Sequence, residues 1–293
     1  MNRTKILSTA VIFLSSTLAL ALPQSAPPTS GSPAPQAAPA STQQAAPAPA
    51  QNAAPAAASK SPQPKTQAEY DAFKTAASLN DPVKLQAAAT DFAQKFPDSE
   101  LRPFLFQQAM GEYQAANNSE KALEMARTVL KFDPNNAVAL LTAAQILAER
   151  THDTDLDRDD RLAEADADAR SALHHAGDIP QPSNLTPEQY AGAMAQLRGT
   201  AHEVIATVAF KKLDYFSAIK EYNAAASEEK EHTDAVVWLR LAVANDKSGD
   251  FSAATDAVNK AIAASEPGSQ IRQLADQESS RLGKLSVATP AKK

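Results

Sequence analysis

The residues best suited to metal chemistry form an aspartate-rich stretch in the middle of the chain. Their spacing matches positions one, three, five and twelve of a calcium-binding loop, and the candidate ligands are Asp153, Asp155, Asp157 and Glu164. Position six of such a loop needs glycine for its sharp turn, whereas this sequence has Arg158, and position eight carries Asp160 where an apolar residue is usual. A lengthened, solvated turn between two helices explains the same residues. Calcium or small-ligand binding through this loop is therefore the alternative hypothesis.

Groups that could carry out catalysis are sparse. The chain has no cysteine, which excludes thiol catalysis, disulfides and Cys-ligated metals. It contains no G-x-S-x-G elbow, no Gly-rich phosphate loop and no H-E-x-x-H motif. His174 and His175 are adjacent, and adjacent residues of a helix point about 100° apart, so the two cannot face one metal ion. A Ser-His-Asp triad built from distant positions would leave no such pattern, and nothing indicates one. The sequence predicts a protein that is not an enzyme and has no cofactor.

The elements that would position any site begin only after an unusual N-terminal segment. The 293 residues include 63 alanines but only 16 aromatic residues and 8 glycines, which disfavours an all-β fold. No charged residue occurs from residue 6 to residue 59, and 11 of the 20 prolines lie between residues 23 and 64. The average composition therefore describes two different kinds of segment.

The first segment has the pattern of a secretory signal peptide over residues 1–21. Arg3 and Lys5 precede an apolar run over residues 6–18, and residues 19–21 provide a small-x-small cleavage site. The alternative is an uncleaved membrane anchor. Residues 22–65 are rich in Ala, Pro and Gln, a composition that predicts a disordered linker, and residues 286–293 are expected to form a disordered tail. We expect export to the periplasm, with secretion or N-terminal anchoring as alternatives, and no membrane insertion after signal cleavage.

From residue 66 onward, apolar residues recur at helical spacing, and each interval between breaks holds one helix of about 12 to 15 residues. The breaks themselves repeat, since Pro97 and Pro134 are 37 residues apart and Ala218 and Ala254 are 36 apart. The best unit spans residues 234–267, and its marker residues are Trp238, Leu241, Ala242, Gly249, Ala254, Val258, Ala261 and Pro267. This unit resembles the tetratricopeptide repeat pattern W-x2-L-G-x2-Y…A-x3-F…P, with Asn245 at the place of the tyrosine.

The resemblance to the tetratricopeptide repeat family implies an all-α fold, an α-α superhelix or solenoid of stacked helical hairpins. The helical domain would cover residues 66–285, with about five hairpins and a C-terminal capping helix over residues 270–285. A generic bundle of amphipathic helices is the alternative. In such a fold His202 replaces the tryptophan of its unit and would be a packing residue.

The same resemblance implies a function. In this family the first helices of the hairpins line a concave groove that binds peptides or partner helices. Transferred by offset, the groove residues are Phe104, Gln107, Gln114, Gln145, Glu203, Thr207, Val236, Leu239 and Asp246. They lack the Lys and Asn cluster that clamps a C-terminal carboxylate. We therefore expect an exported, non-enzymatic scaffold of a bacterial cell envelope that binds another envelope protein or a peptide segment.

Charge narrows the choice of partner. Residues 66–285 contain 22 basic and all 34 acidic residues, a net charge of −12. Nucleic acid is a poor partner for such a surface because its phosphates would be repelled. No oligomeric state is predicted.

Overall fold

The computed structural model describes residues 62–288, and this part of the chain is helical, without a β-strand. Its eleven α-helices are α1 (Gln67–Ala77), α2 (Pro82–Lys95), α3 (Arg102–Ala115), α4 (Ser119–Phe132), α5 (Ala137–Arg150), α6 (Arg158–His175), α7 (Pro187–Lys211), α8 (Tyr215–Glu229), α9 (Ala235–Ser248), α10 (Phe251–Ala264) and α11 (Gln270–Ala288). Two short 3-10 helices, η1 (Ala176–Asp178) and η2 (Lys230–His232), follow α6 and α8. The predicted all-α fold class is confirmed.

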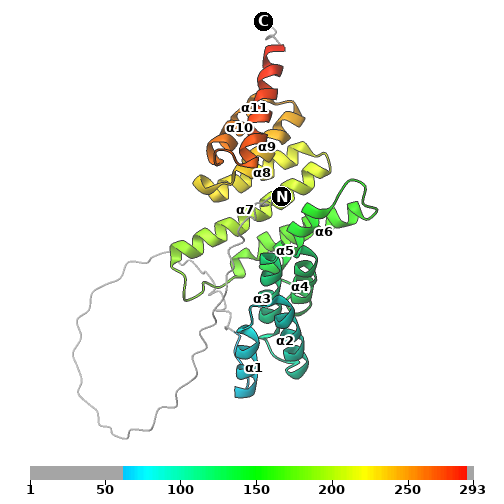
Figure 1. Ribbon diagram of the computed structural model, residues 1–293, viewed down its shortest axis with the longest axis vertical. Coiled ribbons are helices and arrows are strands. Elements are labelled where there is room, and N and C mark those ends of the chain that lie inside the picture. Colours follow the sequence, from blue (N-terminus) through cyan, green and yellow to red (C-terminus); the bar gives the residue numbers. More distant parts are fainter. Residues whose placement is uncertain (1–61, 289–293) are drawn as a thin grey trace, which may run out of the picture.

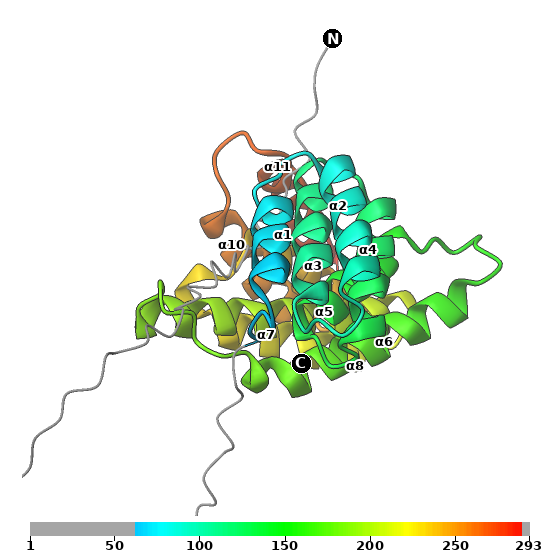
Figure 2. The same cartoon turned by 90° about the horizontal axis from the view of Figure 1, so that it is seen from below.

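The helices pair in chain order. Each odd-numbered helix from α1 to α9 packs against the helix that follows it, which gives five hairpins. The second helix of one hairpin contacts the first helix of the next, and α11 packs on the last hairpin. Figure 1 shows the hairpins stacked from α1 to α11, and both views show α7 running across the direction of α1 to α4 (Figures 1 and 2). This arrangement confirms the predicted solenoid of stacked helical hairpins.

Side-chain caps mark where the second helices of the hairpins begin. At four of these helix starts a side chain accepts a hydrogen bond from the backbone amide three residues later, and the capping residues are Asp81, Asn118, Asp214 and Asp250. Each cap satisfies an amide that has no partner within its helix and contributes about 1 kcal/mol. The polar breaks seen in the sequence are thus helix starts as well as turns.

Three of the hairpin turns share one backbone conformation. The residue before the cap has a positive φ, 56° at Asn117, 64° at Leu213 and 88° at Gly249. Asparagine and glycine suit this left-handed region, whereas leucine in it carries a steric cost of about 1 to 2 kcal/mol. The Leu213 side chain is 70% exposed, so burial does not offset the cost.

Alanine supplies much of the core. Fully buried alanines occur in helices along the whole stack, among them Ala89, Ala109, Ala126, Ala143, Ala165, Ala201, Ala218, Ala242 and Ala254. A methyl side chain lets two helix axes approach closely, because the distance between packed helices depends on the side chains at the contact. Larger buried residues such as Leu105, Met125 and Tyr222 fill the remaining space.

Two helices of the third and fourth hairpins are longer than predicted. Helix α6 has 18 residues and α7 has 25, so the expected length of about 12 to 15 residues is wrong for both. The first turns of α7 contribute Met194 and Leu197 to a small apolar cluster with η1. The Tyr190 hydroxyl donates to the carbonyl of Ile179 at 2.5 Å. The longer helix is thus held by contacts of its own.

Two basic side chains join the third hairpin to the fourth. The Lys211 ammonium, at the end of α7, donates to the carbonyls of Ala148 and Thr151 at 2.6 Å each. These carbonyls lie at the end of α5, where they have no partner within the helix. In return, the Arg158 guanidinium at the start of α6 donates to the carbonyl of Lys211. Burial lowers the pKa of Lys211, partly opposed by Asp153.

Several predicted segments fall partly outside the described residues. The predicted signal peptide (1–21), residues 22–61 of the predicted linker and residues 289–293 of the predicted tail lie there, and they stay predictions. Helix α11 continues to Ala288, beyond Leu285, where the capping helix was expected to end. No helix in residues 62–288 is long and apolar enough to cross a membrane.

Replacing Lys211 tests the link between hairpins. We expect Lys211→Ala to lower the free energy of unfolding by about 1 to 2 kcal/mol, because two carbonyls at the end of α5 lose a charged donor. Lys212→Ala removes the neighbouring exposed lysine and should change stability by less than about 0.5 kcal/mol. Urea unfolding followed by circular dichroism measures both. Equal losses would contradict a specific role for Lys211.

Replacing Leu213 tests the turn. Leu213→Gly should raise the free energy of unfolding by about 0.5 to 1 kcal/mol, since relief of backbone strain outweighs the added freedom of the unfolded chain. Leu156→Gly alters an exposed leucine without positive φ and should give no gain. Urea unfolding followed by circular dichroism measures both variants. A loss of stability in Leu213→Gly would contradict the presence of backbone strain at this residue.

Candidate functional site

The predicted groove residues all lie on first helices of hairpins, and all are half-buried. Three are on α3 (Phe104, Gln107, Gln114), one on α5 (Gln145), two on α7 (Glu203, Thr207) and three on α9 (Val236, Leu239, Asp246). Contacts between first helices of neighbouring hairpins join α1 to α3 and α5 to α7, and α9 contacts α11. The nine residues therefore lie on the first helices of four successive hairpins.

On α7 the predicted groove residues form part of a half-buried polar network. Glu203 accepts a hydrogen bond from Arg240 on α9 at 2.5 Å, and Thr207 lies 3.2 Å from the Tyr222 hydroxyl on α8. Burial raises the pKa of Glu203, and the Arg240 charge opposes this shift. Burial also raises the pKa of Tyr222. Glu203 and Thr207 thus hold three helices together, and their polar atoms already have partners.

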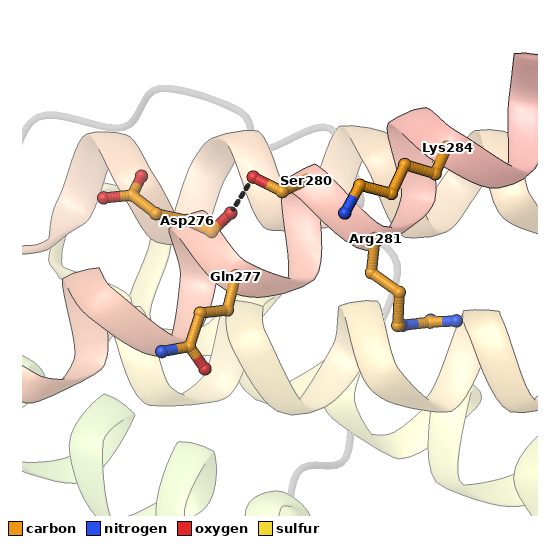
Figure 3. Close-up of a pocket in the computed structure, with 5 residues that line it drawn as sticks. All are labelled: Asp276, Gln277, Ser280, Arg281 and Lys284. Carbon is orange, nitrogen blue, oxygen red and sulfur yellow. Dashed lines mark hydrogen bonds between the residues drawn. The ribbon is translucent and has the colours of Figure 1, made fainter.

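Asp246 is likewise engaged, by the C-terminal helix. Arg281 of α11 forms ion pairs with Asp246 at 2.5 Å and with Glu278 at 2.9 Å, and hydrogen bonds to these carboxylates raise the pKa of the guanidinium. Figure 3 shows Arg281 beside a hollow on α11, whose other lining residues are Asp276, Gln277, Ser280 and Lys284. All five lining residues belong to α11, so this hollow is the surface of a single helix, within which the Ser280 hydroxyl donates to the Asp276 carbonyl. Helix α11 covers the predicted groove at Asp246.

The remaining polar candidates, on α3 and α5, are less engaged. Gln107 accepts a hydrogen bond at 3.2 Å from Asn136, the residue that caps α5. Gln114 and Gln145 make no side-chain hydrogen bond to another residue of the range 62–288. An amide side chain offers two donors and an acceptor, which suits the backbone of an extended peptide.

The apolar candidates divide between core and surface. Phe104 packs against a cluster formed by the first two hairpins and α5, and Leu239 packs against a cluster formed by the last two hairpins and α11. Val236 is half-buried at the start of α9. Among the nine predicted groove residues, Gln114, Gln145 and Val236 are thus the least engaged by other residues of the stack.

Arginines hold the acidic side chains of the candidate calcium loop. Asp153 pairs with Arg158 at 3.2 Å, Asp155 and Asp157 lie 3.7 and 3.9 Å from Arg161, and Glu164 of α6 pairs with Arg127 of α4 at 2.8 Å. Within residues 62–288 no group of three or more acidic or histidine side chains is arranged to hold a metal ion. The four candidate ligands are distributed among three arginines and are not brought together in a cage.

Two carboxylates of α8 that contact other groups of the stack were not predicted from the sequence. Glu221 is buried, and its carboxylate lies 2.7 Å from the Nδ1 atom of His202 on α7. His202 is half-buried, so the packing role expected for it is combined with a polar contact. Glu229, which is half-buried, lies against α7, where a Cβ added to Gly199 would approach its Oε1 atom within 2.7 Å. An isolated glycine within a helix often marks such a close approach. Gly199 is therefore the residue from which the contact with Glu229 could have been predicted.

The comparisons with known proteins concern the fold. No family model matches the sequence, and no curated protein matches it. Among solved structures, a tetratricopeptide repeat protein of Thermus thermophilus has a TM-score of 0.45 and 13% identity, over 72% of this chain and 98% of that one. PilW, a type IV pilus biogenesis factor, has a TM-score of 0.47 and 16% identity over 76% and 94% of the two chains. PilF of Pseudomonas aeruginosa has a TM-score of 0.49 and 14% identity over 77% and 96%.

Tetratricopeptide repeat proteins are thus among the solved structures to which this chain is similar. Every TM-score given above lies below 0.5, so the description of the fold depends on the hairpins themselves.

Glu229 generates a prediction about pH. Burial, followed by the nearby charge of Glu203, raises its pKa to about 7 from the ordinary value of 4.5. A carboxyl group with a raised pKa stabilises the folded state below pH 4.5, and this contribution is lost as the pH rises through 7. Because the side chain is only half-buried and solvent screens it, we expect a loss of only about 1 kcal/mol.

The variant Glu229→Gln should remove this loss. Its free energy of unfolding should exceed that of the parent by about 1 kcal/mol at pH 8 and match it at pH 4, because the neutral amide carries no charge that burial and Glu203 would disfavour. Glu228→Gln, next to it in sequence and paired with Arg198, should retain the parental pH dependence. Chemical unfolding at the two pH values is the measurement. An unchanged pH profile in Glu229→Gln would show that another group is responsible.

Proposed function

We propose that this chain is an exported, non-enzymatic scaffold that binds a segment of another envelope protein along the first helices of its hairpins. The observation that carries the proposal is the series of half-buried residues on α3, α5, α7 and α9. A stack of hairpins presents such a series as an extended surface, which repeat proteins use for binding. The signal-like N-terminus supports export, and the net charge of −12 over residues 66–285 favours a protein over nucleic acid.

The contacts within the site divide the proposed groove into two functional parts. Glu203, Thr207 and Asp246 position helices, because their polar atoms are engaged by other helices of the stack. Gln114 and Gln145 would contact the partner, since their amides have no partner within residues 62–288. Such amides recognise the backbone of an extended segment, while Val236 and neighbouring apolar groups would accommodate its side chains.

A partner bound this way should be captured by a photo-crosslinker on the groove. We expect p-benzoylphenylalanine at Gln145 to give a defined crosslinked product in cells. The same group at Gln94, which is exposed on the second helix α2, should give none. Immunoblotting detects the products and mass spectrometry identifies them.

Substitutions of the residues proposed to contact the partner should weaken binding, whereas substitutions on second helices should not. The double variant Gln114→Ala/Val236→Ser should reduce the crosslinked product at least fivefold while its thermal unfolding midpoint stays near that of the parent. Gln94→Ala/Asn259→Ala, on exposed positions of α2 and α10, is the matched control. Equal crosslinking from Gln145 and Gln94, or equal yields from both double variants, would refute binding along the first helices.

A further inference from the structure

The most exposed large apolar side chains of residues 62–288 come from two neighbouring connections. Leu156, between α5 and α6, is 106% exposed, and Leu213 and Phe216, at the turn from α7 to α8, are 70% and 82% exposed. We name these three residues the apolar corner. Isolated exposed leucines need no explanation, but several exposed apolar residues gathered in one place mark an interaction surface.

Hydrogen bonds hold the two connections together. Lys211, two residues before Leu213, donates from its side chain to the carbonyl of Thr151 and accepts at its own carbonyl from Arg158. Both ends of residues 151–158 are therefore fixed to the end of α7, with Leu156 between them. In Figure 1 both connections lie at the right-hand side of the molecule.

Backbone strain at Leu213 is a second, independent observation. At the equivalent place, the turns between α3 and α4 and between α9 and α10 have Asn117 and Gly249, residues that tolerate a positive φ. Leu213 has the same conformation and leaves its side chain in solvent, so the fold gains nothing from leucine there. Strained residues that do not serve the fold are concentrated at functional sites.

The charges around the corner indicate the chemistry of its partner. Close to Leu156 most aspartate side chains are exposed, whereas Asp155 and the two arginines of the loop, Arg158 and Arg161, are largely buried. The exposed acidic residues are Asp153, Asp157, Asp159 and Asp160. On the other side, near Phe216, the exposed bases are Lys212 and Lys220. The surface presented beside Leu156 is therefore negative, which opposes an anionic lipid surface and attracts basic groups.

We propose that the apolar corner is a second docking site, separate from the groove, for an amphipathic helix of a partner protein whose apolar stripe is bordered by lysines or arginines. Leu156, Leu213 and Phe216 would pack against the stripe, and the exposed aspartates would pair with the basic border. Helix recognition of this kind depends on apolar residues at positions i, i+3, i+4 and i+7.

A designed peptide tests the corner without a known partner. The probe is a fluorescein-labelled Leu/Lys helix of sequence LKKLLKLLKKLLKL, added to the full chain after signal removal and followed by fluorescence anisotropy. We expect saturable binding that Leu213→Gly/Phe216→Ser weakens at least fivefold. Asp159→Asn/Asp160→Asn should weaken it at low salt and make it less sensitive to added NaCl. The first double variant should remain folded, because Leu213→Gly relieves strain and Phe216 is exposed.

The matched control is Val83→Ser, which removes an exposed apolar side chain at the start of α2, away from the corner. It should bind the peptide as the parent does. Equal binding by the parent and Leu213→Gly/Phe216→Ser, equal binding of a Leu/Glu version of the peptide, or no binding would each overturn the proposal. So would sedimentation showing a dimer that only the corner variant dissociates, because the occupant would then be a second copy. Phosphatidylglycerol vesicles that bind the parent but not the corner variant, without peptide binding, would identify a lipid surface instead.

Discussion

The structure depends on how closely its helices can approach one another. A hairpin repeat has a small core, and each unit must bury its apolar face against the next. Alanines with no exposed surface, such as Ala109, Ala126 and Ala218, make that approach possible along the stack. Polar side chains also join helices of the stack, as Arg240 of α9 does with Glu203 of α7. Apolar packing and internal polar contacts both join the helices of this protein.

The fold could be predicted from the sequence because its signals are local. Breaks such as the one at Asp250 contain the cap of the next helix, and the recurrence at 36 and 37 residues reflects one hairpin. The length of α7 could not be predicted in this way, since its first turns are stabilised by η1 and Tyr190, which are not part of the repeat. Offsets within a repeat specify the helix on which a residue lies, but they contain no information about insertions.

The candidate site was predictable only in part, for the same reason. The offset places all nine groove residues on first helices, yet it could not reveal that Arg240 and Arg281 come from other helices and engage Glu203 and Asp246. The aspartate loop shows the same limit, because the spacing of its carboxylates matches a calcium loop while Arg158 and Arg161 occupy them. The partners that a polar side chain has in the fold decide whether it is available to a ligand, and the spacing of residues along the sequence does not specify those partners.

The pairing of helices in chain order has a consequence for how the protein forms. The packing of the described residues joins each helix mainly to helices one or two places away in the chain. Few long loops must therefore close before stabilising contacts appear, which is the condition for rapid folding. Such a chain can assemble progressively from any hairpin that has formed, and neighbouring hairpins then add to it in both directions.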